Sequence, residues 1–222
     1  MPISPNLRAV VFDLDGLMFN TEELYDDVGG ELLRRRGHVF TPQLKDAMMG
    51  RPGRVALAVL VEQLGLTDSV ETLLDESTAI FHGILDDRLQ QMPGLGDLLD
   101  ALEAAELPKG IATSSGRAFV ERVLGRFDLA PRFGCILTCE DVTHGKPHPE
   151  VYLKAAERLG FPPAEVLVLE DSHHGCCAAA AAGTFAVAVP GDHSRRHDFS
   201  RASLVIDTLA DPRLYEALGL KR

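Results

Sequence analysis

Short apolar runs alternate with amphipathic stretches along most of the chain. Six runs are rich in β-branched or small residues, which is typical of strands buried on both faces of a parallel sheet. They lie at Ala9–Phe12, Gly110–Thr113, Ile136–Thr138, Val166–Leu169, Phe185–Val189 and Leu204–Ile206. Helical patterns lie between them at Leu95–Ala105, Ala118–Phe127, Glu150–Leu159 and Cys176–Ala182. This order predicts an α/β fold with a doubly wound parallel sheet and helices on both of its faces.

The region from residue 21 to residue 89 breaks this alternation. It contains no strand pattern, and its helical patterns lie at Glu22–Arg36, Pro42–Met49, Arg54–Leu64 and Val70–Leu89. It ends near Pro93 and Gly94, residue types that are common at turns and hinges. We therefore expect a core domain, residues 1–20 and 90–222, interrupted by a helical domain, residues 21–89. Such an insertion beside a loop of the core is placed to act as a lid.

The composition narrows the function classes. Of 222 residues, 45% are hydrophobic and 25% are charged, as in ordinary globular proteins. The formal net charge of -11 argues against nucleic acid and anionic membranes as partners, because both select basic surfaces. No apolar run is long enough to span a bilayer, and the first residues lack the layout of a signal peptide. We therefore expect a cytoplasmic protein.

Carboxylates follow two of the predicted strands. Asp13 and Asp15 come after the first strand and before the breaker Gly16, whereas Glu170 and Asp171 come after the fourth. The first pair alone is equally compatible with a capped turn at the end of a strand. In open α/β sheets, however, ligands bind at the carboxyl ends of strands, and buried like charges need a cation or a proton. The two pairs together predict a site for a hard cation such as Mg²⁺.

Polar residues follow two further strands. Thr113 and Ser114 precede a turn, and a hydroxyl with successive backbone N–H groups can cradle a phosphate. Lys146 lies between Gly145 and Pro147, and an ammonium group can hold a phosphoryl oxygen. Each signal is weak alone, since Ser and Thr routinely cap helices. Beside the carboxylates, they predict an anion site next to the cation site.

A second cluster, His173, His174, Cys176 and Cys177, has residue types that bind zinc. The spacing does not match a structural zinc site, and no second pair follows at a matching distance. Reduced thiols are the better interpretation of these cysteines.

The four motifs occur in a recognisable order. Asp13-Leu14-Asp15-Gly16, Thr113-Ser114-Ser115, Lys146-Pro147 and Glu170-Asp171-Ser172 resemble the four motifs of the haloacid dehalogenase superfamily. The resemblance covers essentially the whole chain, including the place of the helical insertion. It implies a Rossmann-like core with a mobile cap, Mg²⁺ as cofactor, and phosphoryl transfer through an aspartyl-phosphate.

The resemblance also assigns the two aspartates of the first motif. Asp13 matches the nucleophile, because a carboxylate can accept a phosphoryl group covalently. Asp15 matches the general acid and base, which protonates the leaving oxygen and later activates water. Its backbone carbonyl would also face the metal, so that Asp13 and Asp15 both belong to the expected metal site.

The other motifs supply the expected phosphate and metal contacts. Thr113 and Lys146 match the residues that hold the phosphate, assisted by the backbone N–H of Ser114. Asp171 matches a direct Mg²⁺ ligand. Glu170 matches a residue of the metal site that supports the ligands without binding the ion directly.

Comparison within the superfamily separates the possible activities. Asp15 excludes haloacid dehalogenases proper and phosphonate-cleaving relatives, which lack an acid there. Mutases of the β-phosphoglucomutase type carry a cap histidine and a cap arginine where this chain has Tyr25 and Gly53. Arg51 and Arg54 lie beside the second position and are candidates for substrate contact.

We therefore predict a phosphatase for a small phosphorylated metabolite, such as a sugar phosphate or a nucleoside monophosphate. A phosphosugar mutase is the alternative enzyme, and a binding or regulatory protein is disfavoured by the intact Asp13 and Asp15. Asn20 departs from the family, which usually has Asp there. We expect a monomer, and the sequence does not identify the substrate.

Overall fold

The chain folds into two compact units. The computed structural model describes residues 6–48 and 53–220. One unit, here called the cap unit, is Thr21–Gln90. The other, here called the core unit, is Met1–Asn20 together with Gln91–Arg222. None of the helices described in the two units is long and apolar enough to cross a membrane.

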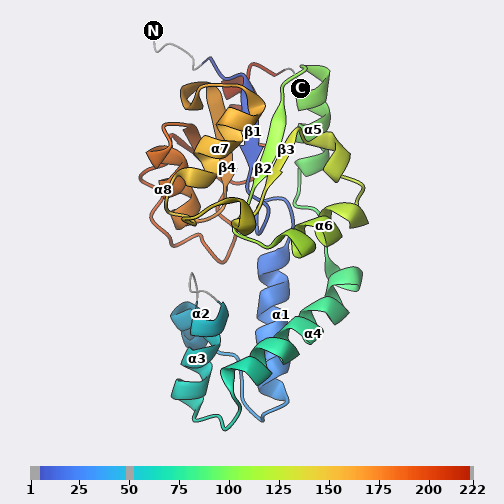
Figure 1. Cartoon of the computed structure of the whole chain (residues 1–222), viewed down its shortest axis with the longest axis vertical. Helices are drawn as coiled ribbons and strands as arrows, with labels where there is room; N and C mark the ends of the chain where they lie inside the picture. The colour runs from blue at the N-terminus through green and yellow to red at the C-terminus, as the bar shows by residue number, and fades with distance from the viewer. Residues whose placement is uncertain (1–5, 49–52, 221–222) are drawn as a thin grey trace. The chain divides into compact units, whose positions relative to one another are not determined.

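The core unit is built on a parallel sheet. Its strands, as far as the structure describes the chain, follow the order β3-β2-β1-β4-β5-β6. Figure 1 labels the four strands β1 to β4. The strand bounds are Ala9–Phe12 for β1, Lys109–Ala112 for β2, Cys135–Leu137 for β3, Val166–Glu170 for β4, Phe185–Ala188 for β5 and Leu204–Val205 for β6. The order reverses at β1, which pairs with both β2 and β4. The predicted doubly wound α/β fold is confirmed.

Both faces of the sheet are buried. Alternate side chains of the central strands β1 and β4, including Val11 and Val168, join one apolar cluster with α7 (Glu150–Leu159) and α8 (His173–Ala181). Ala178 and Ala179 are fully buried there, and their small side chains let α8 approach the sheet closely. Figure 1 shows α7 and α8 on one side of the sheet and α5 on the other.

Of the remaining helices of the core unit, α5 and α6 lie near their predicted positions, whereas α9 and three short 3-10 helices were not predicted. These helices are α5 (Leu95–Ala104), α6 (Arg117–Arg126), α9 (Pro212–Ala217) and the short 3-10 helices Ala130–Arg132, Cys139–Asp141 and Pro163–Glu165. The predicted start of α8 at Cys176 is wrong by three residues. The Ser172 side chain caps the helix by accepting a hydrogen bond from the Gly175 N–H at 3.1 Å, so the helix begins at His173.

The described residues of the cap unit form helices joined by loops, with no strand among them. Its helices are α1 (Thr21–Arg34), α2 (Pro42–Met48), α3 (Gly53–Leu64) and α4 (Val70–Arg88). Each end lies within two residues of its prediction, although Met49 falls outside the described residues. The interior of the unit includes one or more buried leucines from three of these helices, each on the apolar face of its helix. They are Leu32, Leu60, Leu73 and Leu85.

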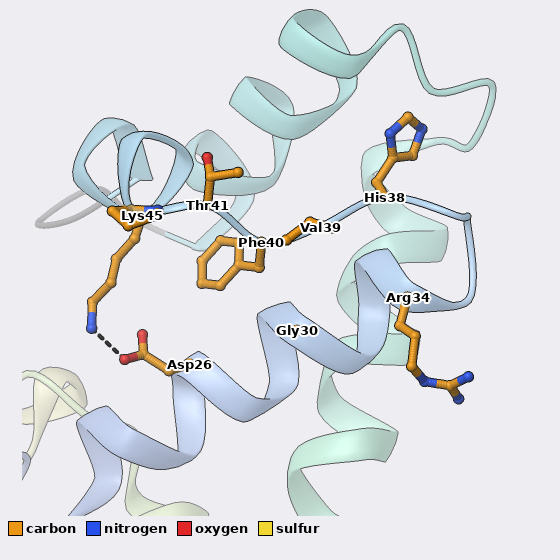
Figure 2. A pocket seen from close by; sticks show the side chains of 9 residues that line it. Asp26, Gly30, Arg34, His38, Val39, Phe40, Thr41 and Lys45 are labelled. Carbon is orange, nitrogen blue, oxygen red and sulfur yellow. Dashed lines mark hydrogen bonds and ion pairs between the residues drawn. The ribbon is translucent and has the colours of Figure 1, made fainter.

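An open pocket of about 630 Å³ lies between α1 and the segment that follows it. Figure 2 shows the Phe40 ring over α1 and the Lys45 side chain pointing to Asp26, with which it forms an ion pair. The ring packs against Gly29, where a Cβ atom would come within 2.7 Å of it. Glycine at position 29 therefore lets the Phe40 ring, which lines the pocket, lie close against α1.

Candidate active site

Carboxylates gather at the carboxyl ends of the two central strands. Phe12 pairs with Leu169, and the Asp13 N–H donates to the Leu169 carbonyl at 3.0 Å, so Asp13 leaves the sheet beside Glu170. Asp13, Glu170 and Asp171 are all buried, with exposures of 6%, 0% and 4%. Because the strand order reverses at this point, the edge is the place where open α/β sheets bind ligands.

Lys146 joins three of the strand ends. Its Nζ donates to Asp13 Oδ1 at 2.5 Å, to Glu170 Oε1 at 2.7 Å and to the Ala112 carbonyl at 3.0 Å. The lysine belongs to the loop before α7, and only 7% of its side chain is exposed. The structure thus brings residues 13, 146 and 170, which lie far apart in the sequence, into direct contact.

Burial dominates the electrostatics of this group. Desolvation raises the pKa of Asp13 well above its ordinary value; Lys146 opposes the shift, and Glu170, Asp171 and Asp15 add to it. Burial alone lowers the pKa of Lys146, but the charges of Asp13 and Glu170 outweigh it, so the pKa of Lys146 is raised. Lys146 therefore stays charged, and it is a single cation among several carboxyl groups. Such a site favours a further cation.

The donor atoms fit a hard metal ion. One carboxylate oxygen each from Asp13, Glu170 and Asp171 lies within 4.8 Å of the other two. Oxygen ligands of this kind suit Mg²⁺. Gly16, at φ +72°, keeps the space free, since a Cβ atom there would lie 2.3 Å from Asp171 Oδ2. His193 Nε2 lies 2.7 Å from the same oxygen.

Asp15 is held on the other side of the site. Its Oδ2 accepts hydrogen bonds from the Ser115 hydroxyl at 2.6 Å and from the Thr113 hydroxyl at 3.3 Å. The Ser115 N–H donates to Thr113 Oγ1 at 3.0 Å, which fixes the loop after β2. Ser114, between them, is exposed. The loop therefore orients the Asp15 carboxylate, which is not one of the three convergent donors described above.

Glu170 is fixed by several donors besides Lys146. The Tyr152 hydroxyl donates to Oε1 at 2.5 Å, and the Ser172 hydroxyl donates to Oε2 at 2.9 Å. Gly175 makes room for the carboxylate, because a Cβ atom there would lie within 1.7 Å of Oε1. Because Glu170 is buried and held by these hydrogen bonds, its carboxylate is a fixed acceptor that positions Lys146.

The sequence analysis assigned no site contact to Ser115, although it belongs to a quoted motif, nor to Tyr152 or His193. Ser115 was visible as the second residue after Thr113, and a tyrosine among apolar helix positions signals a hydroxyl that needs a partner. The contact between His193 and Asp171 spans a loop and has no local signal in the sequence.

The predicted substrate contacts Arg51 and Arg54 belong to the cap unit. Arg51 lies outside the described residues. Arg54 lies on α3, in the cap unit, where its Nη1 pairs with Glu71 Oε1 at 2.5 Å and 63% of its side chain is exposed.

The His173 cluster makes other contacts. Cys177 Sγ lies 3.6 Å from His173 Nε2, and His173 Nδ1 lies 2.6 Å from the Asp198 carbonyl oxygen. Among the described residues, this cluster does not bring three possible ligand atoms together, whereas two other groups do.

Comparison with known proteins agrees with this arrangement. The profile of the haloacid dehalogenase-like hydrolase family matches residues 10–189. A phosphorylated carbohydrates phosphatase from Thermotoga maritima is 33% identical over 177 residues, which are 80% of this chain and 82% of that protein. A Drosophila melanogaster protein named as a probable pseudouridine-5′-phosphatase is 35% identical over 207 residues, 90% of this chain and 89% of that one.

A solved structure extends the likeness to three dimensions. A haloacid dehalogenase family hydrolase from Deinococcus radiodurans R1, crystallised with bound phosphate and sodium, superimposes with a TM-score of 0.83 at 30% identity. The match covers 98% of this chain and 99% of that one. With its four motifs at neighbouring strand ends and its match to the family over residues 10–189, this chain belongs to the haloacid dehalogenase-like hydrolases and is an enzyme of that family.

Proposed function

We propose that the enzyme is a Mg²⁺-dependent phosphatase that hydrolyses a small phosphorylated metabolite through an aspartyl-phosphate on Asp13. The observation that carries this proposal is the shared contact of Lys146 Nζ with Asp13 and Glu170, beside Asp171, at a buried strand edge. This arrangement holds a reactive carboxylate next to a permanent cation.

The chain's own residues supply two chemical steps. A carboxylate oxygen of Asp13 attacks the phosphorus; a new P–O bond forms, and the ester P–O bond to the leaving group breaks. Asp15 gives its proton to the leaving oxygen, then takes a proton from the water that cleaves the phospho-aspartate. Lys146 offsets the charge that spreads over the phosphoryl oxygens during transfer.

The hydrogen bonds from Ser115 and Thr113 support the role of Asp15, because they orient its carboxylate. In this proposal the Thr113 hydroxyl and the Ser114 N–H hold phosphate oxygens together with Lys146.

The metal would be held by Asp13, Asp171 and the backbone carbonyl of Asp15, with Glu170 fixing the surroundings. Mg²⁺, when bound, would neutralise part of the charge that the carboxylate and the phosphate bring together. The convergence of the Asp13, Glu170 and Asp171 oxygens supports this assignment.

The names of two relatives support the proposed substrate class. The names of the two similar proteins refer to a phosphorylated carbohydrate and to pseudouridine 5′-phosphate, both small phosphorylated metabolites. We assign a sugar phosphate or nucleoside monophosphate to this enzyme, with Arg51 and Arg54 of the cap as candidate contacts. Arg54 would exchange its exposed ion pair with Glu71 for the substrate.

Hydrolysis is favoured over phosphosugar mutation. A mutase must keep water away from its phospho-aspartate, and its cap needs groups that recognise the sugar phosphate. At the corresponding positions, Tyr25 stacks on Phe81 with ring centroids 4.8 Å apart, and Gly53 begins α3. Neither position provides the charged group of a mutase.

A panel of phosphorylated metabolites, assayed for phosphate release, tests the proposal. EDTA should abolish turnover and added Mg²⁺ should restore it, and the Asp13→Asn variant, purified in parallel, controls for contaminating phosphatases. Undiminished activity in metal-free buffer contradicts the role of the metal. In a second assay, β-glucose 1-phosphate is supplied with a trace of its 1,6-bisphosphate. Conversion to glucose 6-phosphate much faster than phosphate release contradicts hydrolysis.

A further inference from the structure

A second group of possible metal ligands lies on the loop that carries Lys146. One ligand atom each from His144, His148 and Glu150 lies within 4.8 Å of the other two. Both histidines are exposed, whereas the three carboxylates of the active site are buried. We propose that His144, His148 and Glu150 form a separate binding site for a borderline transition cation such as Zn²⁺.

The spacing of two of the ligands fits tetrahedral coordination. Zinc holds nitrogen and oxygen ligands at about 2.1 Å, which places neighbouring tetrahedral ligands about 3.4 Å apart. His144 Nδ1 lies 3.2 Å from Glu150 Oε2, close to that spacing. The His144 and His148 rings lie 4.6 Å apart between centroids. The His148 side chain is exposed, so packing leaves it room to turn toward the same ion.

Glu150 is held in place before any metal arrives. It accepts hydrogen bonds from the Thr143 and His144 N–H groups, each at 2.9 Å, and from Lys154 Nζ at 2.7 Å. The hydrogen bond from Lys154, followed by those from the two backbone groups, lowers the pKa of Glu150 to about 2, so the carboxylate is ionised at neutral pH. A fixed, charged ligand reduces the ordering that binding requires.

The histidines require little rearrangement. The His148 N–H closes a turn by donating to the Gly145 carbonyl at 3.0 Å. His148 Nδ1 accepts from the Glu150 N–H at 3.3 Å, a long hydrogen bond that a metal bond readily replaces.

The surrounding charge selects the kind of metal. Lys154 and the start of α7 place positive charge beside Glu150, which works against a cation held by electrostatics alone. Mg²⁺ relies on oxygen ligands and net negative charge, whereas imidazole nitrogens suit Zn²⁺, Ni²⁺ and Cu²⁺. The proposed site therefore takes a different class of cation from the carboxylate site. Lys146 lies between the two histidines in the sequence, so an ion bound to both would restrict the motion of the loop that carries Lys146.

Zinc titration of the full chain in excess Mg²⁺ tests the proposal. Excess Mg²⁺ competes for the carboxylate site that the proposed function assigns to it, and the histidine variants identify which site holds the zinc. We expect one high-affinity Zn²⁺ per chain. His144→Gln and His148→Gln should each weaken its binding by at least about 10-fold, as loss of even an indirect partner of a metal does.

Two control variants remove other histidines. His82→Gln replaces an exposed histidine of α4. The double variant His173→Gln/His174→Gln removes the two histidines at the start of α8. Both should bind zinc like the unchanged protein. Equal zinc affinity in all variants, or loss of binding only in the double variant, overturns the proposal.

Hydrogen exchange gives a readout that does not depend on affinity. Zinc should slow amide exchange in residues 143–148 of the unchanged protein and leave it unaltered in His148→Gln. Circular dichroism of each variant checks that its fold is intact. Zinc-independent exchange in this loop of the unchanged, zinc-loaded protein contradicts the site.

Discussion

Each unit of the molecule contains a lysine paired with an aspartate, and the two pairs lie in very different surroundings. In the core unit, the Lys146 and Asp13 side chains are 7% and 9% exposed. In the cap unit, the Lys45 and Asp26 side chains at the open pocket of Figure 2 are 26% and 43% exposed. The same residue types therefore have different consequences, because water screens one pair and is excluded from the other.

Burial makes the core pair costly for folding and useful for chemistry. Lys146 and Asp13 lose their hydration on folding, which costs free energy. Glu170 holds the Lys146 ammonium group and is itself held by the Tyr152 and Ser172 hydroxyls. The desolvated carboxylate of Asp13 is thereby fixed beside a cation, as phosphoryl transfer needs. The cap pair remains hydrated and contributes little to stability or to reactivity.

The largest expected effect is on catalysis, from Asp13→Asn. An amide cannot form the phospho-enzyme, so phosphate release should fall by at least about 10⁴-fold, as with removal of other enzymatic nucleophiles. Asp26→Asn in the cap unit is the matched control and should retain most of the activity. A rate near that of the unchanged enzyme for Asp13→Asn shows that Asp13 is not the nucleophile.

Asp15→Asn should have a large but smaller effect. The nucleophile remains, but proton transfer to the leaving oxygen and from water is lost, which slows both steps by about 10²–10⁴-fold. A substrate with a much better leaving group should recover part of the first step, because it needs less protonation. Steady-state and burst kinetics on both substrates measure this. Equal losses on the two substrates argue against the proton-donor role.

Removing each lysine compares the stability of the two pairs directly. Lys146→Met leaves Asp13 and Glu170 buried without their cation, which should cost about 3 kcal/mol of unfolding free energy in metal-free buffer. Lys45→Met should cost below about 1 kcal/mol, because its aspartate remains hydrated. Urea denaturation measures both. Similar losses of unfolding free energy for the two variants would contradict the claim that burial sets the energetic cost of removing each lysine.

The smallest expected effect is a pH dependence in the cap unit. Hydrogen bonds from Arg34 and then Arg35 lower the pKa of Glu31 from 4.5 to about 2. Because the folded-state pKa is lowered, the stabilisation is present above the ordinary pKa and is lost as the pH falls toward about 2. Glu31→Gln should therefore lose a small amount of stability at pH 6 and almost none at pH 2. Added salt should shrink the difference, since these groups are exposed.

Much of the core unit could be predicted because its signals are local. Short buried runs predict parallel strands, and the carboxyl ends of parallel strands meet at one edge, which places Asp13, Glu170 and Asp171 together. The early start of α8 also had a local signal, because Ser172 is a favourable N-cap.

Contacts between distant segments could not be predicted in the same way. The Tyr152 hydroxyl meets Glu170 only because α7 packs on the sheet, and His193 reaches Asp171 from a loop. The partner of Arg54 is Glu71, on the following helix, and neither a helical period nor a motif specifies that pair. Hydrophobic patterns determine which face is buried, whereas long-range packing determines which polar groups meet there.

The most direct test of the central claim is a search for the phospho-enzyme itself. The enzyme is mixed with a good substrate and Mg²⁺, quenched in acid during turnover, digested and mapped by mass spectrometry. The account predicts one phosphoryl group on the peptide that contains Asp13, absent in Asp13→Asn and lost on brief alkaline treatment. Turnover with no phosphorylated peptide at any quench time, or with the phosphoryl group on another residue, contradicts it.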